Sequence, residues 1–405
     1  MSEHPRTDWP GFLPALEFDL SESPVEAKLP SDIAIEPPAP DVPLEVFRWS
    51  GIWSGWAGQA RVIDVKLVVE TVSATAATVV CIVGSEQGGY RCERIAASLF
   101  GNELHGRLAT GTVVAYRMRN PQIVEMFWQS GPERWIAGVL SQGAAANFER
   151  IRVPTAFVED DQPVSLEMVI AKPEGDGPFP TLLFNHGSTG VGNDPALFRT
   201  TSTNPALARF FVERGWLVAF PQRRGRGKSD GQYGEGLASD GSGYSHDPGC
   251  ALAGFGRALE DLAEAHQHLL TRSDVESNRL MIGGHSRGGA LAIAYAGEHA
   301  NGFDGVLNFV GGWLGERCTT AREVNGAVFR RGAYFDKPTL WLYANNDPFY
   351  TLAHSRKNFE TFTRAGGRGS FHVVDTDPDE DGHHIIARPD RWERLVNDYL
   401  LLGLS

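Results

Sequence analysis

The segment Gly284-His285-Ser286-Arg287-Gly288 limits what this chain can fold into more than any other part of the sequence. It follows the apolar run RLMIG, typical of a buried strand, and precedes GGALAIAYA, typical of a helix. A serine in a sharp turn between a strand and a helix has a strained backbone that exposes its hydroxyl, and flanking glycines avoid collisions with neighbouring elements. The helix N-terminus also directs backbone N–H groups at this position. We therefore predict that Ser286 is a nucleophile at the edge of an α/β sheet.

A serine hydroxyl is a weak nucleophile, so it needs a general base, and the base needs an acid that orients it. In folds with this turn, the three catalytic residues occur along the chain in the order serine, acid, histidine. Asp347 comes just after the strand-like run TLWLY, and His383 lies in the loop after SFHVV. Because active sites of open α/β sheets form at the carboxyl ends of strands, we expect Asp347 to be the acid and His383 the base.

Two other residues compete for these roles. His384 is the alternative base, and we favour His383 because the preceding Gly382 gives the loop freedom to turn the ring inward. Glu316, which follows the strand-like run GVLNFV, is the alternative acid. The acidic loop 375–381 is typical of a solvated surface, and a metal ligand among its acids is the alternative. Because the triad chemistry needs no metal and no ligand spacing is visible in the sequence, we expect neither a metal nor a cofactor.

The strand-like run TLLFN leads into His186-Gly187-Ser188, a turn that can present a backbone N–H to the nucleophile. An oxyanion hole in this type of fold takes one donor from such a turn and one from the residue after the nucleophile. We therefore assign the two donors to the N–H groups of Ser188 and Arg287. We expect His186 to be a structural hydrogen-bonding residue rather than a second base.

Three sections of different pattern follow one another along the chain. Residues 1–43 are rich in proline and acidic residues, which predicts an extended arm or linker. Residues 44–145 contain short strand-like runs separated by turn residues, which predicts a small all-β barrel or meander. In residues 146–405, strand-like and helix-like runs alternate, which predicts a mostly parallel sheet covered by helices on both faces. We therefore expect an α/β-hydrolase catalytic domain behind a small all-β domain.

The first strand-like run of the β region, RVIDVKLVVE, alternates apolar with polar residues, which is the period of a half-buried strand. Trp49, Trp53 and Trp56 open the region. We expect these rings to fill the barrel core, and a binding platform for carbohydrate is the alternative. The order of tryptophan and glycine here loosely resembles that of lipocalin-like domains.

Charge and composition exclude some partners. The chain has 405 residues and a formal net charge of −13 at pH 7, which argues against non-specific binding to nucleic acid or to anionic membranes. It contains no apolar run long enough for a membrane helix, its N-terminal residues show no signal-peptide pattern, and its four cysteines are scattered, which favours free thiols. We expect a cytoplasmic protein, either monomeric or a homo-oligomer.

From about residue 178 to residue 384, the chain resembles the dienelactone-hydrolase-like branch of the α/β-hydrolase superfamily. The matching segments are GPFPTLLFNHGS, FPQRRGRGKSDG, GGHSRGG, LWLYANNDP and DGHH. The resemblance implies catalytic roles for Ser286, Asp347 and His383. Dienelactone hydrolases proper use a cysteine as nucleophile, so the serine of this chain indicates an ordinary esterase. The segment RRGRGKSDG also recurs in related peptidases and acyl-esterases. We expect its arginines and Lys228 to form salt bridges or loop contacts, and contact with an acidic part of the substrate is the alternative.

The leading functional hypothesis is the hydrolysis of a small-molecule carboxylic ester through an acyl-enzyme intermediate. Cleavage of amides or peptides by the same triad is the alternative, and a binding protein with an inert hydrolase domain is a third hypothesis. Substrate choice depends on the segments that cover the site, for which 189–205, 231–248 and 312–335 are the candidates. Five aromatic residues either line an apolar pocket or belong to the core: Trp313, Phe329, Tyr334, Phe349 and Tyr350.

Overall fold

The computed structural model divides the chain into two compact units, Met1–Ala145 and Ala146–Ser405. The structure describes residues 27–39, 42–57, 63–85, 89–120, 123–131, 134–143, 148–199, 201–378 and 381–403. Each unit has its own hydrophobic core.

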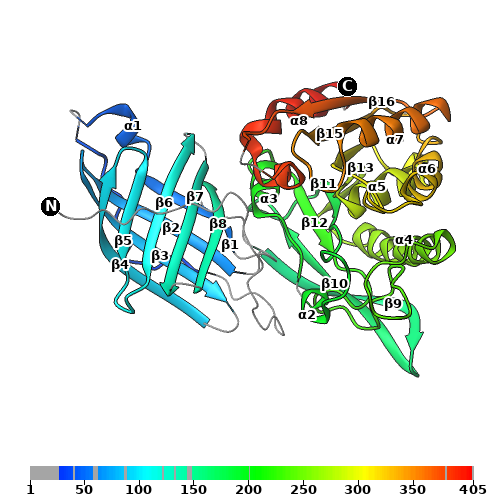
Figure 1. Cartoon of the computed structure of the whole chain (residues 1–405), viewed down its shortest axis with the longest axis horizontal. Coiled ribbons are helices and arrows are strands. Elements are labelled where there is room, and N and C mark those ends of the chain that lie inside the picture. The colour runs from blue at the N-terminus through cyan, green and yellow to red at the C-terminus, as the bar shows by residue number, and fades with distance from the viewer. Residues whose placement is uncertain are drawn as a thin grey trace. The chain divides into compact units, whose positions relative to one another are not determined.

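The first unit is a closed barrel of eight strands (Figure 1). Each strand pairs antiparallel with the next along the chain, and β1 closes the barrel by pairing with β8. The elements are α1 (Leu44–Phe47), β1 (Gly51–Ala57), β2 (Ile63–Val72), β3 (Ala76–Ser85), β4 (Gly89–Phe100), β5 (Glu103–Arg107), β6 (Val113–Asn120), β7 (Ile123–Gly131) and β8 (Arg134–Gln142).

The sequence predicts strands at 61–70, 77–83, 112–118, 123–128 and 135–140, so β1, β4 and β5 have no predicted counterpart. Most residues of β4 are exposed or half-buried, so its sequence, GYRCERIAASLF, lacks the apolar alternation of a core strand. Its place in the barrel comes from backbone pairing with β3 and β5. Backbone hydrogen bonds between strands do not depend on the side-chain pattern. The neighbouring strands, and not the local sequence, therefore make this segment a strand.

Large apolar side chains fill the inside of the barrel. Trp49 and Trp53 are fully buried there, with ring centroids 6.4 Å apart, and the indole N–H of Trp53 donates to the carbonyl of Trp49 (2.9 Å). For these two rings, the structure confirms the core position. The side chain of Trp56 lies outside the described residues.

The described part of the arm covers one outer face of the barrel. Ala27 N–H donates to the carboxylate of Asp64 (2.8 Å), and the ammonium of Lys66 donates to the carbonyl of Ala27 (2.6 Å). Further along, Ala34 N–H donates to Glu70 (3.1 Å). The polar residues of β2 are therefore buried, and the prediction of a half-buried strand was wrong because the arm supplies partners on the outer face. Residues 1–26 of the arm lie outside the described residues.

The second unit contains an eight-stranded sheet with the order β9-β10-β12-β11-β13-β14-β15-β16. Strand β10 is antiparallel to both of its neighbours, β9 and β12, and the remaining pairs are parallel. This is the topology of the α/β-hydrolase fold, which confirms the predicted fold class. The strands are β9 (Phe148–Glu159), β10 (Gln162–Ala171), β11 (Phe179–Asn185), β12 (Leu217–Pro221), β13 (Val275–His285), β14 (Gly305–Phe309), β15 (Thr339–Ala344) and β16 (Gly369–Val374).

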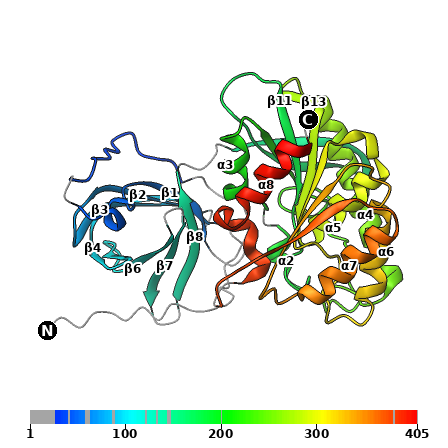
Figure 2. The ribbon, with the colours of Figure 1, turned by 90° about the horizontal axis from the view of Figure 1, so that it is seen from above.

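Helices cover both faces of this sheet. Helices α3 (Pro205–Val212) and α8 (Pro389–Gly403) lie on one face, where Phe210 packs on Trp392 with ring centroids 5.0 Å apart. The other face carries α4, α5, α6 and α7 (Figure 2). Their bounds are α4 (Pro248–Leu270), α5 (Arg287–Glu298), α6 (Ala321–Gly332) and α7 (Leu352–Arg364), and the short elements are α2 (Pro195–Phe198), η1 (Ala300–Gly302) and η2 (Gly382–Ala387). Among the helices of the described residues, none has both the length and the apolar composition that crossing a membrane requires.

Helix α6 lies in a segment that we expected to cover the active site and did not predict as a helix. Its sequence, AREVNGAVFRRG, contains several charged residues and a glycine that weaken the helical pattern. Val324, Val328 and Phe329 nevertheless face inward and are fully buried. At Gly332, a Cβ would lie 2.4 Å from Ile293 of α5, so the two helices pack tightly, and this contact stabilises α6.

A buried carboxylate, that of Asp274, links the segment before β13 to the end of β10 through ion pairs. The carboxylate of Asp274 accepts hydrogen bonds from Arg272 (2.8 Å) and Lys172 (2.8 Å), and the Arg272 guanidinium lowers the pKa of Asp274 to about 2. Because the folded-state pKa lies below the ordinary value, this carboxylate stabilises the fold above about pH 4, and the contribution is lost as the pH falls toward 2.

We therefore expect Asp274→Asn to lower the free energy of unfolding at pH 7 by about 2 kcal/mol. The difference from the wild type should shrink between about pH 4 and pH 2, as the carboxyl becomes protonated in both states. Urea unfolding at pH 7, 4 and 3 checks this, with Asp336→Asn, at an exposed position, as the control. A deficit that stays constant over this pH range would contradict the assignment.

Candidate active site

Ser286 lies in the turn between β13 and α5, at the carboxyl end of its strand. Its backbone has φ 55° and ψ −122°, a conformation that residues with a side chain rarely adopt. Two hydrogen bonds hold the turn: Ser286 N–H donates to the carbonyl of Phe309 on β14 (2.9 Å), and the carbonyl of Ser286 accepts from Gly312 N–H (3.2 Å). The neighbouring strand and the loop after it thus keep this strained residue in place.

The glycines around Ser286 are required by close backbone packing. A Cβ at Gly284 would lie 2.1 Å from the carbonyl oxygen of Gly288, and a Cβ at Gly288 would lie 2.1 Å from that of Asn185 at the end of β11. A Cβ at Gly187, in the next turn, would lie 3.1 Å from Cβ of Ser286. The ends of β11 and β13 therefore pack on each other at the serine.

Asp347 follows β15, and His383 lies in η2 after β16. The structure brings them together: Asp347 Oδ2 lies 3.0 Å from His383 Nδ1. The other carboxylate oxygen accepts from the backbone N–H groups of Phe349 (2.8 Å) and Tyr350 (3.0 Å). The side chain of Asp347 is completely buried, and both of its oxygens have partners. A bond through Nδ1 selects the tautomer of His383 in which Nε2 can accept a proton.

His285, the residue before the serine, connects the turn to His383. The ring N–H at Nε2 of His285 donates to the carbonyl of His383 (2.7 Å), and the two ring centroids are 4.9 Å apart. In the described part of the chain, no hydrogen bond joins the Ser286 hydroxyl to the ring of His383. His285, the neighbour of Ser286 in the chain, is the residue of the turn that contacts His383.

The alternative base and acid make other contacts. The side chain of His384 is 48% exposed and lies 3.7 Å from Asp381. Glu316 accepts a hydrogen bond from Thr351 N–H (2.6 Å), at the start of α7. Of the four candidate residues, Asp347 and His383 are the acid and base between which the structure describes a hydrogen bond.

The turn after β11 lies beside Ser286, as its position in the sequence predicts. Within the described residues, the structure assigns no acceptor to the backbone N–H of Ser188 or of Arg287, the first residue of α5. Both groups can therefore donate to a ligand, and their role as oxyanion donors stays a prediction. The ring of His186 is buried, and burial together with the charges of Arg223 and Arg226 lowers its pKa well below the usual value, so it is a neutral hydrogen-bonding group.

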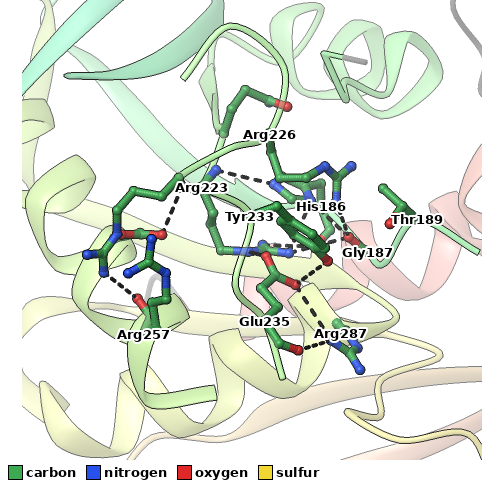
Figure 3. Close-up of polar contacts among 12 residues, drawn as sticks. His186, Gly187, Thr189, Arg223, Arg226, Tyr233, Glu235, Arg257 and Arg287 are labelled. Atoms are coloured by element: carbon green, nitrogen blue, oxygen red, sulfur yellow. Dashed lines mark hydrogen bonds and ion pairs between the residues drawn. The ribbon is translucent and has the colours of Figure 1, made fainter. Parts of the chain in front are cut away.

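A buried cluster of charged and hydroxyl groups surrounds this turn, and sequence reasoning found only part of it (Figure 3). The arginines after β12 form ion pairs, as expected: Arg223 pairs with Glu235, and Arg224 with Asp261. Glu235 itself lies in the loop between β12 and α4, where no periodic pattern marks a residue as buried. Its role in the cluster carried no signal in the sequence.

The predicted aromatic residues fall into two groups. Trp313, Phe329 and Tyr350 are buried in the protein, whereas Tyr334 is 80% exposed. Phe349 is 42% exposed, and its ring centroid lies 4.6 Å from that of His383. Among the five, Phe349 is therefore the accessible aromatic wall next to the histidine.

No group of three or more histidine, cysteine or acidic side chains that could hold a metal ion occurs in the part of the chain that the structure describes. Asp379 and Glu380 of the acidic loop lie outside it. An open cavity of about 480 Å³ in the second unit is lined by Glu159, Asp160, Gln232, Tyr233, Gly234 and Arg257, none of which is a predicted site residue.

Part of the chain is similar in sequence to the prolyl oligopeptidase family. Residues 202–313 match the model of the prolyl oligopeptidase family. Prolyl oligopeptidase A of Galerina marginata is 24% identical over 200 residues, which is 49% of this chain and 23% of that protein, so the match spans about a quarter of the relative's length.

Two solved structures are similar to this chain over most of their own length. The esterase, from Pyrococcus furiosus, has a TM-score of 0.45 and 14% identity, over 64% of this chain and 92% of that one. The other protein, from Klebsiella pneumoniae and provisionally named dienelactone hydrolase, has a TM-score of 0.40 and 16% identity, over 62% and 98% of the two chains.

We expect Gly288→Ala to abolish soluble expression or to lower turnover at least 100-fold, because the added Cβ meets the carbonyl oxygens of Asn185 (2.1 Å) and His186 (2.6 Å) and must displace the turn. The matched control is Gly256→Ala in α4, where a Cβ meets nothing within 4 Å. The control should stabilise the fold by roughly 0.5–1 kcal/mol, since alanine is the better helix former. Ester turnover and thermal unfolding of both variants check this, and normal turnover by Gly288→Ala would contradict it.

Proposed function

We propose that this chain, a serine hydrolase of the α/β-hydrolase superfamily, cleaves carboxylic esters of small molecules through an acyl-enzyme intermediate. The observation that carries the proposal is the contact between Asp347 and His383, 3.0 Å long, beside the strained backbone of Ser286. A buried carboxylate on Nδ1 of a histidine, close to a serine in a sharp turn between a strand and a helix, is the arrangement that acyl transfer needs.

In the proposed reaction, His383 takes the proton of Ser286 as the hydroxyl attacks the ester carbonyl. The free enzyme need not hold the serine–histidine bond, because such bonds often form only when substrate is bound. The N–H groups of Ser188 and Arg287 stabilise the negative charge that develops on the carbonyl oxygen. His383 then gives its proton to the leaving alcohol. In the second half of the reaction, His383 takes a proton from water as the water attacks the acyl-enzyme, and it returns the proton to the oxygen of Ser286 as the bond to the acyl group breaks.

Asp347 acts in this scheme by fixing and stabilising the histidine. Its Oδ1 is held by the N–H groups of Phe349 and Tyr350, so its Oδ2 stays aimed at His383. The carboxylate therefore selects the productive tautomer and stabilises the imidazolium that forms during attack. Phe349 offers an apolar surface next to His383 for the acyl or alcohol part of the substrate.

Peptide cleavage is the second candidate, because residues 202–313 match the prolyl oligopeptidase family. Cleavage of an ester needs less catalytic assistance than cleavage of an amide. An alkoxide is a better leaving group than an amide nitrogen, and its departure depends less on protonation by the enzyme. A p-nitrophenyl ester series of increasing acyl length, assayed beside a proline-containing peptide p-nitroanilide, tests the choice. We expect turnover of the esters, and efficient cleavage of the anilide alone would overturn the proposal.

Ser286→Ala should lower ester turnover at least a thousandfold and abolish labelling by a fluorophosphonate, because it removes the attacking oxygen. The fold should be retained, since the backbone bond from residue 286 to Phe309 does not involve the hydroxyl. Circular dichroism and thermal unfolding serve as the control. Residual turnover above about a thousandth of the wild-type rate would exclude Ser286 as the nucleophile.

Asp347→Asn should lower kcat by about 10³–10⁴-fold, because an amide favours the wrong tautomer of His383. Glu316→Gln is the matched control, since Glu316 bonds to Thr351 and not to the histidine, and its kcat should stay within about twofold of the wild type. If Glu316→Gln loses activity while Asp347→Asn keeps it, the acid has been assigned to the wrong residue.

A further inference from the structure

A single buried carboxylate, that of Glu235, connects the two backbone segments that carry the proposed oxyanion donors. Glu235 is 2% exposed and lies between the guanidinium groups of Arg223 and Arg287 (Figure 3). Burial alone would raise its pKa, but Arg223, together with Arg287 and Arg226, outweighs this and holds the pKa below its usual value. The group is therefore a carboxylate at neutral pH.

On one side, the carboxylate is linked to the turn after β11. Its Oε1 is paired with Nε of Arg223. The two remaining nitrogens of that guanidinium donate to the carbonyls of His186 (3.1 Å) and Gly187 (3.3 Å), the residues just before Ser188. The guanidinium of Arg223 thus bonds both to Glu235 and to the backbone next to the first proposed oxyanion donor.

On the other side, Glu235 is linked to the start of α5. Nη1 of Arg287 donates to the carbonyl of Glu235 (2.8 Å) and lies 3.7 Å from its Oε2. The Arg287 guanidinium also stacks on the rings of Tyr244 and Trp313, at 3.5 and 4.4 Å from their centroids. Arg287 carries the second proposed oxyanion donor on its own backbone, so this side chain ties that donor to the same carboxylate.

A third link runs through two tyrosine hydroxyls. Tyr233 donates to Oε2 of Glu235 (3.0 Å), and its oxygen lies 2.6 Å from that of Tyr244. The hydroxyl of Tyr244 accepts from the backbone N–H of Thr189 (3.1 Å), the residue just after Ser188. Ser188 is therefore held on both flanks by groups that lead back to Glu235.

We propose that Glu235 is a positioning residue that sets the separation between the N–H groups of Ser188 and Arg287, and so determines how well the oxyanion hole fits the transition state. The turn needs such a tie because Gly187 and Gly190 give its backbone freedom on both sides of Ser188. An oxyanion hole stabilises the transition state only when its donors are held at the right distance before the reaction. The inference rests on the proposed function, since it assigns a role in the same reaction.

The test is Glu235→Gln, which keeps the size of the side chain and removes its charge. We expect kcat for a p-nitrophenyl ester to fall about 10–100-fold, with KM changed less than about threefold, because the turn affects the transition state more than the bound substrate. The affinity for a trifluoromethyl ketone, which mimics the tetrahedral intermediate, should fall by the same factor as kcat/KM. A residue that only stabilises the fold would not make inhibitor affinity and kcat/KM fall by the same factor.

Glu159→Gln is the matched control, because Glu159 is also an arginine-paired carboxylate of this unit. Its partners are Arg257, Arg224 and the N–H of Gln232, which are not the groups that link Glu235 to the turn after β11 or to α5. Its kcat and inhibitor affinity should stay within about twofold of the wild type. Tyr244→Phe is a second variant for the case that Glu235→Gln does not fold. It removes only the hydroxyl that holds Thr189 N–H, and kcat should fall about 3–10-fold with KM unchanged.

Unchanged kcat and inhibitor affinity in Glu235→Gln, or in Tyr244→Phe where the first variant does not fold, would overturn the inference. So would a rise in KM with no change in inhibitor affinity. The wild-type enzyme is measured in the same assay, so the two failures differ. Absence of wild-type ester turnover overturns the proposed function, whereas wild-type turnover with an unimpaired variant overturns only the role of Glu235.

Discussion

The backbone of Ser286 is the constraint on which the rest of the second unit depends. A residue with a side chain at φ 55° persists only where its surroundings leave it no alternative. Here the carbonyl oxygen of Gly288 leaves no room for a side chain at Gly284, and that of Asn185 leaves none at Gly288. The strain at one residue is thus balanced by dense packing of the strand ends around it.

The same packing brings together residues that are far apart in the chain. Ser286, Asp347 and His383 follow three different strands of the sheet, and parallel strands place their carboxyl ends along one edge. The final alignment comes from polar contacts: two backbone N–H groups orient Asp347, and His285 holds the backbone of His383. The sheet brings the three residues to one edge, and the hydrogen bonds orient their side chains.

Buried charge follows one rule in both units. A charged group removed from water is costly unless it is paired, so each buried charge implies partners that are buried with it. In the barrel, Asp64 and Lys66 are paired with each other and with the backbone of Ala27. In the hydrolase unit, Glu235 is paired with Arg223 and lies beside Arg287. In each case the pairing fixes a segment without regular structure, the arm in one unit and the turn beside Ser286 in the other.

The sequence by itself determined the change from an all-β region to alternating strands and helices, and the position of Ser286, because both depend on local patterns of apolar residues and glycine. It also indicated Asp347 and His383, through their places just after strands. Only the tertiary structure decided between His383 and His384 as the partner of Asp347, buried the polar face of β2, stabilised α6 and placed Glu235 between two arginines. Adjacent residues such as His383 and His384 have the same local signal. Which of them turns inward depends on Asp347 and His285, whose distance in space is set by the sheet and not by spacing along the chain.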